Sequence, residues 1–208
     1  MSGYIYLPIP TQEMHDFCNF WILGQNDKGK TPYRILENKH SGVVKKAFRY
    51  FDGVLSNVTP FDKVYILVHG HGSGSPCLGA PLGATKVMVR GFEEWTGGTL
   101  KKYTPIELAQ LLKKESLPLN FVDLRVFACG SGVIPNRDGI TASFAERLAN
   151  ELRKIGYMNI KVTGYLGTLQ ATYSIRMLDS ETFTNTRHKG VYSSHGYLKP
   201  ASLGKVIF

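Results

Sequence analysis

The sequence predicts an α/β fold in which a mostly parallel sheet carries helices on both faces and is followed by a β-rich C-terminal segment. Two strands of the kind buried on both faces, Lys63 to Val68 and Val122 to Ala128, each run into a glycine-rich turn. Helices with N-terminal capping signals follow each of them. Strands that alternate with helices in this way are joined by crossovers, which produce parallel sheets. We expect a single domain over residues 1–208.

The N-terminal part begins with a strand and continues with two helices. Tyr4 to Leu7 is β-prone and ends at a proline. Thr11 is a candidate N-cap, and the residues after it repeat at helical spacing (Met14, Phe17, Cys18, Trp21 and Ile22). This apolar stripe gives Cys18 a packing role. Residues 25–30 form a polar loop, and a second helix is expected over residues 41–55.

The middle of the chain contains the first glycine-rich turn and a capped helix. The strand Lys63 to Val68 stops at His69-Gly70-His71-Gly72-Ser73-Gly74. Short apolar pieces broken by glycines predict a hairpin or an irregular excursion from Thr85 to Tyr103. Thr104, Pro105 and Glu107 form a capping box, which predicts a helix that runs to about Glu115.

The second half repeats the pattern. Val122 to Ala128 stops at Cys129-Gly130-Ser131-Gly132. Ser143 and Glu146 form a second capping box, and the helix they open is expected to end near Gly156. Asn159 to Tyr165 is the next strand, and the last 35 residues have the composition of strands and loops.

Composition and charge exclude several classes of protein. Hydrophobic residues make up 43% of the chain, which excludes a disordered protein. The 25 Lys and Arg against 16 Asp and Glu give +9, a charge that attracts polyanions but is scattered along the sequence. Three cysteines are too few and too irregularly spaced for a disulfide framework or a metal knuckle, which favours a reducing compartment. No stretch approaches the ~20 apolar residues of a membrane span, so we expect no transmembrane segment.

The two glycine-rich turns predict a thiol–imidazole site. Ligands and catalytic groups gather at the carboxyl ends of parallel strands, and one strand ends in histidine while the other ends in cysteine. Neighbouring strands lie about 4.8 Å apart, so the two side chains meet above the sheet edge if their strands pair. The chemistry is acyl transfer by a thiolate, with backbone N–H groups of Gly72 and Cys129 as donors to the oxyanion.

These two blocks, Val64 to Gly74 and Leu124 to Gly132, resemble the caspase-like (clan CD) cysteine peptidases, in which one strand ends in Gly-His-Gly and a later one in Ala-Cys. The helix and strand after the cysteine look most like the RTX-toxin and CHAT/separase-like branches. The resemblance covers about Lys63 to Tyr165 and implies a caspase-like fold with His71 and Cys129 catalytic and Gly72 in the oxyanion hole. His69 also precedes a glycine and follows the apolar run directly, so it stays a rival to His71.

The resemblance also implies a function and an activator. A member of this family is an endopeptidase acting on protein or peptide substrates, itself included in some branches, and it needs neither a metal nor another cofactor. The RTX-type domains are bacterial effectors activated by inositol hexakisphosphate, which binds a basic cleft formed partly by C-terminal strands. Candidate residues for such a cleft are cationic and C-terminal: Arg176, Arg187, Lys189 and Lys199. An ordinary solvated surface explains the same four residues, and both explanations stay open.

The remaining expectations concern partners, location and specificity. We expect no nucleic-acid partner. The expected location is the cytoplasm, or a host cell reached without a classical signal peptide. The basic balance suits an acidic residue before the scissile bond, and a small apolar pocket for leucine is equally compatible.

Other classes of protein fit the sequence less well. An α/β-hydrolase would use Leu67 to Gly70 as its oxyanion loop, but its nucleophile elbow needs glycines where Phe127 and Ser131 stand. A zinc hydrolase would join the two turn histidines to Cys129 or His195, with no nearby carboxylate to complete the set.

Two non-catalytic functions and one other candidate nucleophile also remain. In the first, Gly70, Gly72 and Gly74 bind a phosphate, but the turn lacks the lysine of a phosphate-binding loop. A non-catalytic caspase-like interaction module is countered by the presence of both His71 and Cys129. Cys77 lacks a strand end that would position it as a nucleophile.

Overall fold

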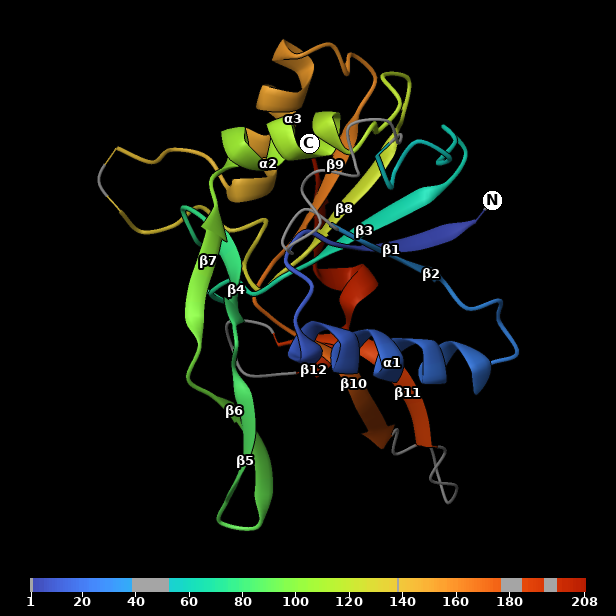
Figure 1. Cartoon of the computed structure of the whole chain (residues 1–208), viewed down its shortest axis with the longest axis vertical. Helices are drawn as coiled ribbons and strands as arrows, with labels where there is room; N and C mark the ends of the chain where they lie inside the picture. Colours follow the sequence, from blue (N-terminus) through green and yellow to red (C-terminus); the bar gives the residue numbers. More distant parts are fainter. Residues whose placement is uncertain (1, 39–52, 138, 177–184, 193–197) are drawn as a thin grey trace.

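A six-stranded sheet with helices on both sides forms the centre of the molecule in the computed structural model (Figure 1). The structure describes residues 2–38, 53–137, 139–176, 185–192 and 198–208. The strands stand in the order β13-β9-β8-β3-β1-β2, with the bounds β1 Gly3–Leu7, β2 Arg34–Glu37, β3 Lys63–Leu67, β8 Asp123–Phe127, β9 Lys161–Tyr165 and β13 Lys205–Ile207. All neighbours are parallel except β13, which runs antiparallel to β9. The predicted α/β class and mostly parallel sheet are confirmed.

Within the described residues, three α-helices cover the two faces of this sheet (Figure 1). They are α1 Gln12–Asn26, α2 Pro105–Lys114 and α3 Phe144–Lys154. Alternate residues of β3 point to opposite faces, as a strand requires. Val64 and Ile66 join the core cluster under α2 and α3, whereas Tyr65 and Leu67 join the cluster under α1. The prediction of helices on both faces is therefore confirmed.

The helix caps agree with the sequence in most respects. Thr11 caps α1, and Thr104 and Glu107 form the complete reciprocal box at α2. At α3 the Ser143 hydroxyl accepts the Glu146 N–H, and the return bond from Glu146 is not among the described hydrogen bonds. Helix α1 continues to Asn26, into the region expected to be a loop.

The second predicted helix cannot be compared over most of its length. Its residues 41–52 lie outside the described part of the chain. Val54 and Leu55, at its predicted end, lie in a turn instead.

The strand order contains a reversal of direction next to β1. The chain steps from β1 to β2 on one side and then places β3 on the other side of β1. At such a reversal the connections leave the carboxyl ends of neighbouring strands in opposite directions, which opens a crevice where α/β proteins bind their ligands. The crevice expected here lies beyond Leu7 and Leu67.

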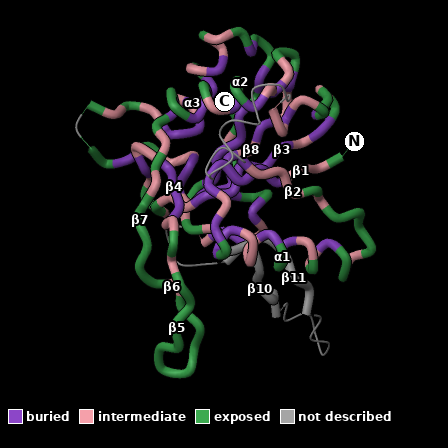
Figure 2. Tube along the Cα trace, viewed as in Figure 1, coloured by how far each residue is buried: buried purple, intermediate pink, exposed green. Residues whose placement is uncertain are grey.

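A pair of antiparallel ribbons fills the excursion between β3 and α2. β4 Leu78–Leu82 pairs with β7 Thr99–Tyr103, and β5 Thr85–Val89 pairs with β6 Phe92–Thr96. The β5–β6 hairpin projects from the body and is exposed along almost its whole length (Figure 2). Its turn residues Arg90 and Gly91 both have positive φ, as a two-residue type I′ turn requires. The expected hairpin is thus present, and β4 was not predicted.

The C-terminal segment is β-rich, as predicted. β10 Thr168–Arg176, β11 Asn185–Tyr192 and β12 Leu198–Pro200 form an antiparallel sheet, and a 3₁₀ turn, η3 Ala201–Gly204, leads into β13. Strands β10 and β11 lie beside α1 (Figure 1). None of the helices in the described ranges is long and apolar enough to cross a membrane.

Candidate active site

The histidine turn and the cysteine turn follow two strands that are direct neighbours. β3 and β8 are parallel and in register, with Leu67 opposite Phe127. His69 and Cys129 each stand two residues beyond this pair in their own strands. The condition under which the sequence places the two turns at one sheet edge, the pairing of their strands, is met.

The two turns are packed so closely that only glycine fits at their contact. A Cβ placed on Gly70 would lie 2.3 Å from the carbonyl oxygen of Cys129. A Cβ on Gly130 would lie 2.1 Å from the carbonyl oxygen of His71, and Gly130 also has a φ of +59°, which favours glycine. The glycines therefore allow the main chains on either side of the thiol to touch.

Ser131 anchors the cysteine turn to the core. Its hydroxyl donates to the carbonyl of Val126 at 2.7 Å and accepts the N–H of Tyr165 at 3.0 Å. Its own carbonyl accepts the N–H of Ala145, at the start of α3. Ser131 is fully buried, so these bonds tie β8, β9 and α3 together directly behind Cys129.

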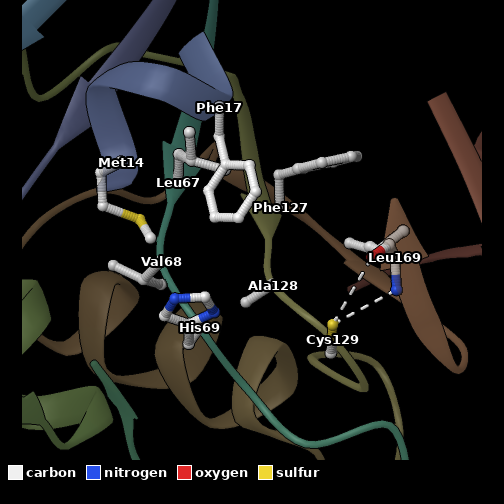
Figure 3. Close-up of a pocket in the computed structure, with 9 residues that line it drawn as sticks. All are labelled: Met14, Phe17, Leu67, Val68, His69, Phe127, Ala128, Cys129 and Leu169. Carbon is white, nitrogen blue, oxygen red and sulfur yellow. Dashed lines mark hydrogen bonds between the residues drawn. The ribbon is translucent and has the colours of Figure 1, made fainter. Parts of the chain in front are cut away.

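A cavity of about 140 Å³ opens beside Cys129 on the α1 side of the sheet (Figure 3). It lies beyond the carboxyl ends of β3 and β8, one strand away from the reversal between β1 and β3. Helix α1, the ends of β3 and β8 and the start of β10 provide walls that are mostly apolar, with Met14, Phe17, Leu67, Phe127 and Leu169 among them. His69 and Cys129 are polar groups of the same lining.

His69 is fixed at one wall of this cavity. Its main chain forms an isolated β-bridge with Gly79, through bonds of 2.7 and 3.1 Å. Its Nε2 lies 3.1 Å from Oε1 of Glu13, and its ring meets that of Phe17 edge-on at 5.9 Å. Glu13 is buried, and its second oxygen has no hydrogen-bond partner among the described residues. The structure thus brings His69, rather than His71, into the cavity with Cys129.

His71 lies on the other side of the histidine turn and is exposed. Its Nδ1 is 2.7 Å from the Ser73 hydroxyl, and its N–H donates to the Ser75 hydroxyl at 2.9 Å. It lines a second cavity, of about 280 Å³, together with Cys77, Lys102 and Arg137. His69 lines both cavities, so the turn divides them.

The Cys129 thiol is half-buried and is held by the first residues of β10. The N–H of Leu169 donates to Sγ at 3.3 Å, and Sγ lies 3.9 Å from the Leu169 carbonyl (Figure 3). Burial raises the pKa of the Cys129 thiol, because water is excluded from its charged form, and the N–H groups near Sγ oppose this only in part. The thiol is therefore protonated at neutral pH in this state.

Gly72, the expected oxyanion donor, lies under the same segment of β10. A Cβ on Gly72 would lie 2.5 Å from Oγ1 of Thr168. Its N–H donates no hydrogen bond to the described part of the chain, whereas the N–H of Gly130 is taken by the Gly167 carbonyl at 2.7 Å. The segment Gly167 to Leu169 thus spans both turns.

The other two thiols differ from Cys129 in their surroundings. All three cysteines are free. Cys18 belongs to α1 and is fully buried on its inner face, and burial raises its pKa to about 12. Cys77 is half-buried in the second cavity. The packing role expected of Cys18 agrees with this burial.

The four candidate polyanion residues lie in the C-terminal sheet, and the structure describes only their main chain. Arg176 belongs to β10, Arg187 and Lys189 to β11, and Lys199 to β12. Arg187 stands opposite Ser174, and Lys199 stands opposite Val191. All four positions therefore belong to the sheet whose first strand bonds Cys129.

In the part of the chain that the structure describes, the side chains that could bind a metal do not cluster around the turns. Within those ranges no three His, Cys, Asp or Glu side chains come close enough to hold an ion. His195, which the zinc alternative offered beside Cys129 as a further ligand, lies outside the described residues.

Sequence reasoning missed two residues of the site, Glu13 and Leu169. An acidic residue in the first turn of a helix is usual, because it complements the helix dipole, so Glu13 gave no distinct signal. Leu169 falls between the predicted strand that ends at Tyr165 and the last 35 residues, in a stretch for which the sequence predicts no element.

Comparison of the chain with protein-family models, with curated proteins and with solved structures found no match. The function has to be argued from the site itself.

Proposed function

We propose that the protein is a caspase-like cysteine peptidase, with Cys129 as the nucleophile and His71 as the proton-transfer group. The observation that carries the proposal is the interlocking of the two turns at the carboxyl ends of β3 and β8, beside a cavity. A thiol, two imidazoles and backbone donors at one sheet edge are the components that acyl transfer needs.

The reaction divides the hydrolysis of a peptide bond into two steps. The Cys129 sulfur attacks the substrate carbonyl carbon while its proton passes to the imidazole of His71. The tetrahedral intermediate then breaks its C–N bond, and the leaving amine takes that proton from the imidazolium. Water attacks the resulting thioester, with its proton taken up by His71, and the acid product leaves as the thiol is restored.

The surroundings of the two histidines favour His71 for proton transfer. The leaving amine lies outside a pocket that holds a substrate side chain, and His71 is the exposed histidine of the turn. Nδ1 of His71 faces both the Ser73 hydroxyl at 2.7 Å and the Ser73 N–H at 3.4 Å; the proposal requires the tautomer in which Nδ1 donates to the hydroxyl, because Nε2 can then accept the thiol proton. His69 has its Nε2 paired with the buried Glu13 and serves as a wall of the cavity.

Backbone N–H groups would stabilise the oxyanion. Gly72 offers an N–H that is not used within the described chain, and Cys129 offers its own. Removing one such donor in hydrolases typically costs about 10²- to 10³-fold in rate.

The proposal includes activation by a polyanion such as inositol hexakisphosphate. Leu169 holds the thiol from β10, and the four cationic candidates lie on the strands of that sheet. A polyanion that shifts this sheet would change the contacts of Sγ. Burial is the main cause of the raised pKa of Cys129, so a shift of this sheet that exposes Sγ to water would lower that pKa and increase the thiolate fraction, with the loss of the Leu169 N–H opposing the gain in part.

The experiment is intact-protein mass spectrometry after reaction with a leucyl peptide chloromethyl ketone, with and without inositol hexakisphosphate. The proteins are wild type, Cys129→Ala and the matched control Cys77→Ala, which removes another half-buried free thiol. We expect one adduct on wild type and on Cys77→Ala, none on Cys129→Ala, and faster labelling with the polyanion.

The histidine variants test the assignment of roles. His71→Ala should slow substrate cleavage by about 10²- to 10⁴-fold, the usual contribution of a general acid–base group, and His69→Ala should have a smaller effect. A larger loss in His69→Ala would transfer the proton-transfer role to His69. Labelling that persists in Cys129→Ala would overturn the proposal.

A further inference from the structure

The cavity beside Cys129 is enclosed by residues that indicate what it binds. Helix α1 contributes Met14 and Phe17, β3 and β8 contribute Leu67 and Phe127, and β10 contributes Leu169. Because the same cavity is lined by Cys129, a group bound in it would lie next to the attacking sulfur.

We infer that this cavity holds the side chain of the residue that precedes the scissile bond, and that it selects a mid-sized apolar side chain such as Leu, Met or Phe. The inference rests on the proposed peptidase function and names the specificity of that same site.

The lack of charged residues in the lining argues against a charged substrate side chain in this cavity. None of the described residues that line the cavity is Asp, Glu, Lys or Arg. A charged side chain would lose its hydration there without gaining a partner. An acidic side chain would in addition meet the buried carboxylate of Glu13, which stands directly behind His69. The acidic preference that the basic composition allowed therefore does not suit this cavity.

The Glu13 carboxylate behind His69 is bonded through Oε1 only, and its Oε2 is buried with no hydrogen-bond partner among the described residues. Oε1 of Glu13 bonds Nε2 of His69, and the His69 ring is held in turn by the edge of Phe17. A lysine or arginine of the substrate would have to displace this imidazole to reach Glu13. The pair therefore acts as a polar end wall and excludes a cation.

Size narrows the choice further. The cavity measures about 140 Å³, close to the ~150 Å³ of an engineered apolar cavity that holds benzene. A leucine, methionine or phenylalanine side chain matches this volume, and alanine leaves most of it empty. The full burial of such a side chain corresponds to roughly a 10- to 150-fold gain in kcat/KM over alanine.

Phe17 is the residue that sets this size. It comes from helix α1, lines the cavity and contacts the end wall, so its truncation would enlarge the cavity. Phe20 offers a matched control, because it is the same residue type in the same helix but is 49% exposed and does not line the cavity.

The test measures Cys129 labelling by peptide chloromethyl ketones that differ only in the residue before the warhead: Ala, Leu, Phe, Trp, Asp or Lys. Wild type and Phe20→Ala should label roughly 10- to 150-fold faster with Leu or Phe than with Ala, and slowest with Asp and Lys. Phe17→Ala should lose rate with Leu and gain rate with Trp.

The outcomes separate this inference from the proposed function. If no probe labels Cys129 in wild type while iodoacetamide does, the peptidase proposal fails and the pocket assignment fails with it. If Cys129 labels fastest with Asp or Lys, the peptidase proposal survives and the apolar pocket is refuted. If Phe17→Ala does not fold, as judged by thermal unfolding, the ranking of the six probes on wild type still decides.

Discussion

The contact between the two turns makes a quantitative prediction for Gly130→Ala. Two costs add at this position. The φ of +59° costs an alanine roughly 1–2 kcal/mol. The new Cβ would also stand 2.1 Å from the His71 carbonyl and within 2.8 Å of two further main-chain atoms, of Gly74 and Gly72. Main chain cannot rotate away as a side chain can, so overpacking adds roughly 1–3 kcal/mol.

Two other glycines allow these costs to be separated. Gly29 has almost the same φ, +61°, and nothing within 4 Å of the added Cβ, so Gly29→Ala carries the conformational cost alone. Gly70 is not in the positive-φ region, and its Cβ would stand 2.3 Å from the Cys129 carbonyl, so Gly70→Ala carries the contact cost alone.

Thermal unfolding followed by circular dichroism measures the difference. For a chain of 208 residues each kcal/mol lowers Tm by roughly 2–4 °C, so Gly130→Ala should melt roughly 2–12 °C below Gly29→Ala. Labelling of Cys129 by the peptide chloromethyl ketone should also fall in Gly130→Ala and Gly70→Ala and stay unchanged in Gly29→Ala. If Gly130→Ala has the same Tm as Gly29→Ala and its Cys129 is labelled at the wild-type rate, the interlocking of the turns is refuted.

Three more predictions concern the thiol, its anchor and a helix cap. Because burial raises the pKa of the Cys129 thiol, its alkylation by iodoacetamide in the absence of polyanion should reach half of its maximal rate at a pH above about 8.5, the pKa of a free cysteine; a half-maximal rate at or below that pH contradicts the described surroundings of Sγ. Ser131→Ala removes both bonds of the hydroxyl: the Tyr165 N–H loses its acceptor in the core, while the Val126 carbonyl keeps the Ala128 N–H. The free energy of unfolding should fall by roughly 1–3 kcal/mol in urea titrations, and an unchanged value would contradict the anchoring role of Ser131. Ser143→Ala removes the cap of α3 and should cost about 1 kcal/mol by the same titration, whereas no change would mean that the cap contributes nothing.

The parts of the fold that sequence predicts well are those determined locally. Threonine or serine caps and apolar residues at helical spacing gave the three helices of the structure. Two near-continuous apolar runs gave β3 and β8. Strand β2 was missed, because a four-residue strand at the sheet edge, Arg34–Glu37, has no pattern of its own and depends on its parallel pairing with β1.

The position of the thiol follows from sequence for the same local reason. Cys129 follows an apolar strand of the kind that lies in the middle of a sheet. Its position at the carboxyl end of a central strand was therefore predictable. The contacts of its sulfur were not, since they come from Leu169, 40 residues later and at the start of a strand in another sheet.

The separation of the two histidines shows where such reasoning ends. Alternation along β3 places Tyr65 and Leu67 on the α1 side, and continued alternation would place both His69 and His71 there. The structure interrupts it at Gly70, because His69 is held in a bridge to Gly79 and the chain then turns at Gly70 against Cys129. That bridge exists only because the ribbon β4–β7 folds back across the end of β3, and β4 draws its stability from a partner about 20 residues away. A long-range pairing therefore decides that His69 shares the cavity with Cys129 while His71 stays exposed, and two histidines that look equivalent in sequence have different surroundings.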